Sequence, residues 1–360
     1  MSPMDTGFQD VLSQGLFLFL FVLLGVTWAF YLAHILTKKG VYARVAQRLL
    51  WVSLAWNAGA LIYRWAAAGH APWANQYESA TMVAFGVLAL YTYFEYVEQE
   101  GKLPLLGLLV LPAAMVAIAA ANLLPEEYKH ISPLMPALQS YWLKIHVSLM
   151  LVSYGSFAST FALSLLYLIR TGAWTRRTTW IALAVASPLA GWFFGYVHQS
   201  ARSDFWNWLM KAMGLTELAY GDTAKAYAVC AAAALAAGLL LAGALQLLPA
   251  RLMESVPEAA TLDELNYRSV AIGFPLLTGG IILGAIWGHV AWGRYWGWDP
   301  KETWAFISWL IFAFFLHMRV FGGWDGRKIA WVGLIGAGSI VFTYWGVNFL
   351  LSGLHAYAKP

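Results

Sequence analysis

The chain has 360 residues, of which 61% are hydrophobic and 11% are charged, and its formal net charge at pH 7 is +4. Soluble domains carry about 25% charged residues, so this composition excludes a soluble globular protein. Apolar runs of roughly 20 residues, the length that crosses a bilayer as a helix, recur from end to end. We therefore expect one all-α polytopic domain over residues 1–360, embedded in a lipid bilayer.

Cysteine usage and charge exclude two further classes. Cys230 is the only cysteine and lies in an Ala/Leu run, so the chain cannot carry out dithiol chemistry alone. The positive charge follows from basic loop residues and gives no reason to expect nucleic acid as a partner. The opening stretch MSPMDTGFQDVLSQG has no positive region before the first apolar run, unlike a cleaved signal peptide.

Hydropathy predicts about ten transmembrane helices. In chain order they are 13–36, 46–66, 79–96, 103–122, 143–169, 178–198, 224–247, 268–290, 303–320 and 329–351. The sixth is the weakest pattern, because it ends in the polar GYVHQS. If the N-terminus lies outside the membrane, the inner loops contain more Lys and Arg than the outer loops, most clearly in TKKGVYARVAQR. Membrane proteins show this bias toward the inner side. We therefore expect an N-out/C-out arrangement.

This arrangement places the loop WGRYWGWDPKETW, within residues 287–304, on the outer face. Its end has a structural explanation: Asp299 fits an N-cap, Pro300 the first helical position and Glu302 a capping box. We favour that explanation for the two acidic residues over a direct role in chemistry.

The aromatic residues of the loop have two interpretations. Trp292, Tyr295, Trp296 and Trp298 lie within one short stretch, where Gly293 and Gly297 allow the backbone to bend. An interfacial aromatic belt is one interpretation, although a belt places one or two aromatic residues at each helix end. The higher density indicates a platform for a large planar apolar ligand.

Two basic residues of the same loop, Arg294 and Lys301, fit carboxylates on such a ligand and fit solvated rim charges equally well.

A planar ligand with carboxylates and a metal centre indicates haem, so histidines matter. His146 begins the fifth predicted helix and His355 follows the last, both at the level of the loop. They fit two axial ligands on opposite faces of one iron, or structural roles. His289, one turn before Trp292, competes with them.

His317 lies about 21 Å deeper at ~1.5 Å per residue, so it cannot share that haem. An ionisable residue at this depth is a functional candidate, and snorkelling to the inner interface is the alternative. His34 also lies near an inner helix end and fits a partner of His317, although snorkelling is favoured. The sequence places His70, His130 and His198 in loops or at interfaces.

A family resemblance rests on four segments: IWGHVAWGRYWGWDPKETWAFISWLIFAFFLHMR, GVNFLLSGLHAYA, LKIHVSLMLVSYGSF and APWANQYES. Together they resemble the CcsA (ResC) subunit of the System II cytochrome c synthase, one of the haem-handling membrane proteins with a tryptophan-rich WWD signature. The resemblance covers most of the chain.

The resemblance implies a holocytochrome c synthase (haem lyase) subunit that transports haem b and attaches it by thioether bonds to the Cys-x-x-Cys-His motif of apocytochrome c. His146 and His355 are then the catalytic ligands of the outer haem iron, and His317 ligates a deeper haem iron. The loop residues expected to contact haem are Trp292, Arg294, Tyr295, Trp296, Trp298, Asp299 and Trp304.

The resemblance also implies partner proteins and a cellular location. A CcsB (ResB)-type membrane subunit supplies the other deep ligand, and a thioredoxin-like thiol reductant keeps the substrate cysteines reduced. We expect the bacterial plasma membrane, with the site on its outer face, in preference to a thylakoid membrane.

Two departures and two alternatives accompany this interpretation. His289 stands where the family has a small or amide residue, and residues 174–250 resemble a two-helix insertion in an eight-helix core. One alternative is a haem exporter or chaperone without ligation activity. The other is a membrane electron-transfer cytochrome with permanent haems.

Overall fold

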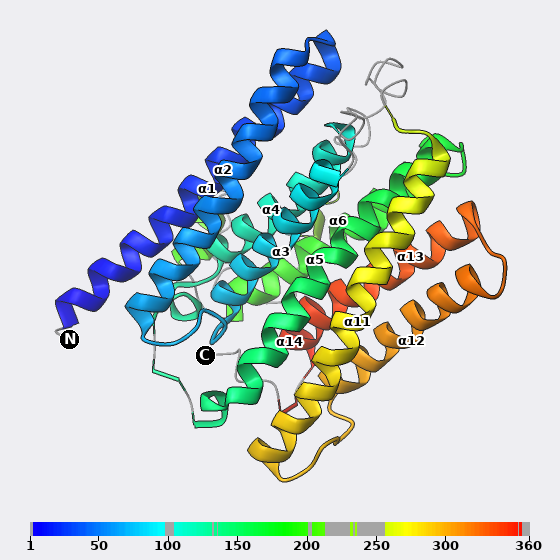
Figure 1. The fold of residues 1–360 in the computed structure, drawn as a ribbon. Helices are drawn as coiled ribbons and strands as arrows, with labels where there is room; N and C mark the ends of the chain where they lie inside the picture. The colour runs from blue at the N-terminus through cyan, green and yellow to red at the C-terminus, as the bar shows by residue number, and fades with distance from the viewer. Residues whose placement is uncertain are drawn as a thin grey trace.

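The computed structural model is a bundle of long helices that run side by side (Figure 1). It describes residues 3–97, 104–131, 133–134, 136–200, 204–212, 231–232, 235, 256–351 and 353–354. Within these residues there is no strand, and 8 helices are long and apolar enough to cross a membrane. The prediction of an all-α polytopic membrane protein is confirmed.

The helices have the following bounds. They are α1 (Pro3–Thr37), α2 (Gly40–Ala68), α3 (Gln76–Val97), α4 (Pro104–Leu123), α5 (Tyr141–Arg170), α6 (Arg176–Ser200), α7 (Asp204–Ala212), α11 (Ala259–Trp292), α12 (Pro300–Val320), α13 (Gly326–Val341) and α14 (Val347–Leu350). Two 3₁₀ turns, η1 (Glu126–Tyr128) and η2 (Pro136–Gln139), precede α5, and a π-helical turn, η3 (Phe342–Gly346), joins α13 to α14.

Nine of the ten predicted spans coincide with helices in the described part of the chain. Of these, α2 is long enough to cross a bilayer but is not among the 8 apolar candidates, because charged and polar residues interrupt it. The seventh predicted span, 224–247, lies outside the described residues except at 231, 232 and 235. The total number of spans and the insertion at 174–250 therefore stay predictions.

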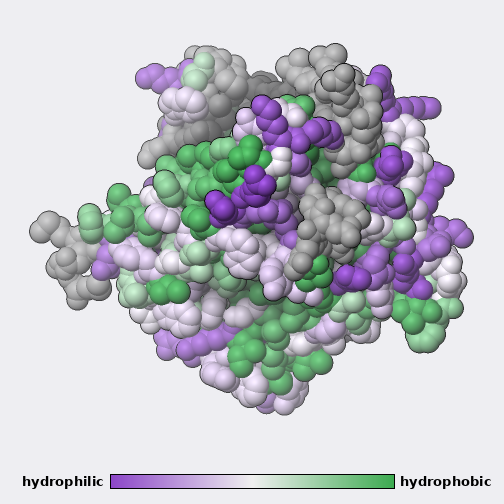
Figure 2. All heavy atoms as spheres, turned by 45° about the horizontal axis from the view of Figure 1, so that its top comes forward, coloured by the Kyte–Doolittle hydropathy of each residue, from purple (hydrophilic) through white to green (hydrophobic). Residues whose placement is uncertain are grey.

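The loops that carry the sequence motifs gather at one end of the bundle. The N-terminus, the 69–75, 124–140 and 293–299 loops and the described end of the chain all lie at the lower end in Figure 1. Figure 2 brings the opposite end forward and shows hydrophilic side chains gathered toward that end, with hydrophobic ones along the flanks below them. The assignment of the motif-bearing end to the outer face of a membrane stays a prediction.

Helix α5 is the central helix of the bundle and packs against α3, α11 and α13. It approaches α3 closely because both helices have glycine at the crossing: a Cβ on Gly155 would meet the backbone of Gly86 and lie 2.7 Å from the Val87 nitrogen. Small residues permit such backbone-to-backbone contact between membrane helices.

Replacing Gly155 with Leu is expected to destabilise the protein by about 1–3 kcal/mol, since α3 and α5 must separate to accommodate the side chain. The midpoint of thermal unfolding in detergent measures the effect. Gly59→Ala in α2 is the control, because nothing lies within 4 Å of its Cβ position. An unchanged midpoint for Gly155→Leu would contradict the tight crossing.

Candidate functional site

A cavity opens at the motif-bearing end of the bundle, between α3, α5, α11, α12 and the η3–α14 segment. It has about 1110 Å³ of empty space, part of it at the open mouth. Its walls include five aromatic residues near the mouth, namely Trp73, Trp287, Trp292, Tyr295 and Trp296.

Among the described residues, His146 is the histidine that lines this cavity, and it lies in the first turns of α5. The Ser140 hydroxyl caps the helix by accepting a hydrogen bond from the Trp142 nitrogen at 3.3 Å. The ring fits against α11 because Gly284 has no side chain; a Cβ there would lie 2.6 Å from His146 Cε1.

The backbone of α11 sets the tautomer of His146. Its Nδ1 lies 2.6 Å from the carbonyl oxygen of Gly280. A carbonyl can only accept, so Nδ1 donates and Nε2 carries the lone pair of the neutral ring. Metal-binding histidines commonly have this arrangement, with one nitrogen held by a carbonyl or carboxylate and the other available for the metal.

Trp287, further along α11, also contacts His146. Its indole is 1% exposed, stacks on the imidazole at 6.2 Å with 15° between the planes, and donates from Nε1 to the Ala137 carbonyl at 2.9 Å. Trp292 packs edge-on against Trp287 at 4.7 Å. Imidazole and indoles therefore form one rigid aromatic wall.

The tryptophan-rich loop joins α11 to α12, and two of its residues have a positive φ. Gly293 has a left-handed conformation with φ 74°, and Trp298 has φ 56°, which is uncommon for a residue other than glycine. The predicted capping box is confirmed: Lys301 N donates to Asp299 Oδ1 at 3.0 Å, and Glu302 Oε2 accepts from the Asp299 nitrogen at 3.2 Å. These bonds fix the loop where α12 begins.

The loop residues predicted to contact the ligand do not all line the cavity. Trp292, Tyr295 and Trp296 line it, whereas Arg294, Trp298, Asp299 and Trp304 are not among its walls. Trp298 is 67% exposed, and Arg294 is exposed with its guanidinium folded against Gly297. Trp304 packs on Phe342 at 4.3 Å.

Asp299 makes a contact that the sequence did not indicate. Its Oδ2 accepts a hydrogen bond from the Leu354 nitrogen at 2.6 Å, and a Cβ on Gly353 would collide with the same carboxylate. The C-terminal segment is thereby held against the start of α12. His355 itself lies outside the described residues, so its predicted role as second ligand stays a prediction.

Among the described residues, three further histidines singled out from the sequence, His289, His317 and His34, are not among the cavity walls. His289 is exposed and stacks on Tyr295 at 4.3 Å with 6° between the rings. His317 is exposed near the end of α12, 5.5 Å from the ring of Phe321. His34 contacts the Lys39 carbonyl at 3.0 Å on α1, which lies on the opposite side of the bundle from α12 (Figure 1), so the structure does not pair it with His317.

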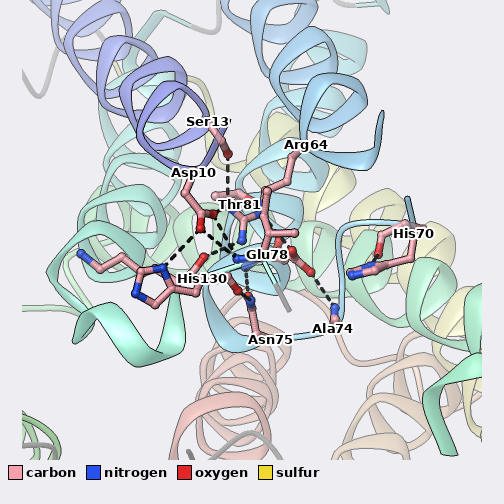
Figure 3. A network of polar contacts seen from close by, with 12 residues as sticks. Asp10, Ser13, Arg64, His70, Ala74, Asn75, Glu78, Thr81 and His130 are labelled. Carbon is pink, nitrogen blue, oxygen red and sulfur yellow. Dashed lines mark hydrogen bonds and ion pairs between the residues drawn. The ribbon is translucent and has the colours of Figure 1, made fainter. Parts of the chain in front are cut away.

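Residues 73–76 also line the cavity, and a buried ion-pair network holds this segment in place (Figure 3). Arg64 is 0% exposed and donates to Glu78 Oε1 at 2.9 Å, to Ser13 Oγ at 3.1 Å and to the Lys129 carbonyl at 2.6 Å. Glu78 Oε2 accepts from the Ala74 nitrogen at 2.8 Å. Asp10 lies 3.7 Å from Arg64, which completes the network.

Several wall residues were missed from the sequence. They lie within the four quoted segments but outside the tryptophan cluster, and no ligand contact was predicted for them: Trp73, Gln76, Tyr154, Trp287 and Asn348. Gln76 and Asn348 could have been predicted to face the interior of the bundle, because uncharged amides are rare in apolar helices and usually hydrogen-bond to neighbouring helices.

Comparison with known proteins agrees with these features. The sequence matches the family described as "Cytochrome C assembly protein" over residues 73–219 and 223–355. The chain belongs to this family. It is similar to proteins named "Cytochrome c biogenesis protein CcsA": that of Synechococcus elongatus is 39% identical over 82% of this chain and 81% of the relative. That of Crocosphaera subtropica is 36% identical over 97% of both chains, and that of Porphyra purpurea is 37% identical over 82% and 81%.

The matched region contains all the cavity walls, from Trp73 to Asn348. The resemblance to CcsA-type proteins that the four sequence segments carry is therefore confirmed at the level of the family. The roles of individual residues rest on geometry.

Proposed function

We propose that this membrane protein presents haem b in the aromatic cavity and joins it by thioether bonds to the Cys-x-x-Cys-His motif of apocytochrome c. Membership of the cytochrome c assembly family gives the chain a role in cytochrome c biogenesis. The observation that carries the finer proposal is His146, whose Nε2 bears the ligand lone pair inside a cavity walled by tryptophans.

The donor set fits a metal that a macrocycle already encloses. Within the described residues, no group of three or more His, Cys, Asp or Glu side chains is arranged to hold a bare metal ion. Haem iron needs one or two axial ligands from protein, because the porphyrin supplies the other four. Indole and phenol rings provide the flat apolar surface that the porphyrin faces require.

In this proposal the protein supplies position, and the reactive groups belong to its two substrates. His146 and His355 hold the iron, and the aromatic wall holds the ring. Each substrate thiol adds across one haem vinyl group: the sulfur forms the C–S bond, the hydrogen goes to the neighbouring carbon, and nothing is released. Holding the vinyl carbon beside the thiol makes this addition effectively unimolecular.

The proposal includes two partner proteins, a second membrane subunit and a thiol reductant. His317 is exposed on α12, which suits a deeper haem shared with a CcsB (ResB)-type subunit that supplies the second ligand. A thioredoxin-like reductant must deliver the substrate cysteines as thiols. We place the protein in a bacterial plasma membrane, with the cavity on the outer face.

Co-expression with the CcsB-type subunit and a reporter that carries Cys-x-x-Cys-His tests the function. Covalent haem on this reporter, and none on a reporter with both cysteines changed to alanine, is the expected result. Haem that leaves the purified protein without becoming covalent would indicate an exporter instead. Haem that neither exchanges nor becomes covalent would indicate an electron-transfer cytochrome.

Gly284→Ala should disturb haem binding without disrupting the bundle. The added Cβ would lie 2.6 Å from His146 Cε1, so the ring must leave the position that the Gly280 carbonyl sets. We expect about tenfold less haem retained by the purified protein, the lower bound for losing such an orienting contact. Gly279→Ala, whose Cβ would lie 3.4 Å from Leu149, is the control; equal haem content in both variants would refute the expectation.

A further inference from the structure

Three polar side chains lie in a row on one wall of the cavity, and they come from three different helices. Lys301 in α12 donates from Nζ to Asn348 Oδ1 at 2.8 Å. Asn348 in α14 donates from Nδ2 to Gln76 Oε1, at the start of α3, at 3.0 Å. All three residues line the cavity.

The direction of every hydrogen bond in this row follows from the lysine. An ammonium group can only donate, so the Asn348 oxygen must face it as the acceptor. The Asn348 amide nitrogen therefore faces Gln76, and Gln76 must use its own oxygen to accept. The row begins with the hydrogens of Nζ and ends with those of Gln76 Nε2, so both of its ends are donors.

The end at Gln76 is unsatisfied. Gln76 is 2% exposed, and its buried Nε2 has no hydrogen-bond partner among the residues that the structure describes. A buried donor left without an acceptor costs about 1–3 kcal/mol, so such groups are rare without a reason. A ligand with an acceptor in the cavity would satisfy it.

The positive charge at the other end lacks a carboxylate partner in the described part of the chain. Lys301 Nζ has no Asp or Glu oxygen within 4.0 Å there, whereas the cations Arg64 and Arg319 have one at 2.9 Å and 2.6 Å. The neighbouring Asp299 binds the Lys301 and Leu354 backbone nitrogens instead. The cavity thus presents a cation and a spare amide donor, while the carboxylate of Glu302, which also lines the cavity, accepts from the Gly297 and Asp299 backbone nitrogens.

We propose that Lys301 and Gln76 form a carboxylate-binding subsite, and that its ligand is a propionate group of the haem. The inference rests on the proposed function and goes beyond it by specifying the orientation of the substrate. The two propionates share one edge of the haem, so a propionate held at Lys301 turns the vinyl edge away from it. Arg294 is exposed and outside the cavity walls, as a solvated rim charge is, whereas Lys301 lines the cavity.

Titration of the purified full chain with iron protoporphyrin IX and with its dimethyl ester tests the subsite by visible absorbance. The ester keeps the iron and the ring but has no carboxylate. For Lys301→Gln we expect free-acid haem to bind at least about tenfold more weakly, the loss typical of a charge-assisted hydrogen bond, with ester affinity nearly unchanged. Lys144→Gln, which removes an exposed charge two residues before His146 and outside the cavity, should bind both like the wild type.

Gln76→Glu provides a second, independent arm. The new carboxylate can still accept from Asn348, but its other oxygen replaces the donor with a negative charge. Binding of the free acid should fall while ester binding stays, and the retained ester binding also shows that the variant is folded.

Equal losses for acid and ester in both variants, or no loss in either, would overturn the subsite and leave the proposed function intact. Failure of the wild type to bind either porphyrin would overturn both.

Discussion

His146→Ala is expected to reduce covalent haem on the co-expressed reporter by at least about 100-fold. Loss of a group that merely orients a metal ligand costs 10–100-fold, and loss of the ligand itself costs at least as much. The side chain contacts Gly284 and Trp287, so its removal leaves a space of imidazole size in the cavity wall. Haem staining of the reporter after denaturing electrophoresis measures the effect.

Added imidazole should partly restore the haem spectrum of His146→Gly in the purified protein, because it occupies that space and supplies the missing nitrogen. His289→Ala is the matched control, since His289 lies at a similar level on α11 but is exposed and stacks on Tyr295. Full reporter maturation by His146→Ala, or an equal loss in His289→Ala, would show that His146 is not the ligand.

Arg64→Met is expected to lower the free energy of unfolding by about 3–5 kcal/mol. The substitution leaves Glu78, which is 0% exposed, without its cation, and a buried unpaired charge is costly. It also removes the donors to Ser13 and the Lys129 carbonyl, which join α1 and the 128–131 segment to α2 (Figure 3). Thermal unfolding of the purified protein in detergent measures the loss.

Arg268→Met supplies the matched control for this prediction. Arg268 and Glu264 form a pair with the same type of atoms at 2.8 Å, but their side chains are 46% and 48% exposed. Exposed pairs contribute about 0–1 kcal/mol, so this variant should unfold almost as the wild type does. If both variants lost a similar amount of stability, burial would not determine how much the Arg64 network contributes to the free energy of unfolding.

The Arg64 network also has a functional consequence. Glu78 holds the Ala74 nitrogen, and residues 73–76 form the wall that carries Gln76 of the proposed carboxylate subsite. Glu78→Gln keeps an acceptor for that nitrogen but loses the charge. Glu78→Gln should therefore affect the free energy of unfolding more than it affects the position of residues 73–76.

The membrane helices and their caps could be predicted from local sequence, because both depend on neighbouring residues. Runs of about 20 apolar residues specify spans, and the Asp299–Glu302 spacing specifies the start of α12 as the structure has it. The predicted span 46–66 likewise coincides with α2, although polar residues interrupt this helix.

Which face of a helix turns inward could not be predicted in this way. His146 and His289 stand at similar levels in the sequence pattern, yet one lines the cavity and the other is exposed. Similarly, Trp296 and Trp298 are two residues apart, yet Trp296 lines the cavity and Trp298 is 67% exposed. These outcomes depend on how the helices and the loop are oriented in the folded bundle, which composition does not specify.

The chain's class, its helices and the motif that shows its family were all present in the one-dimensional pattern, since each depends on residue type and short spacing. The cavity was not. Gln76 and Asn348 are 272 positions apart and meet because α3 and α14 pack at the same end of the bundle, where Lys301 then orients both amides. Contacts of that kind arise from the packing of distant helices, and the physical chemistry of the site begins with them.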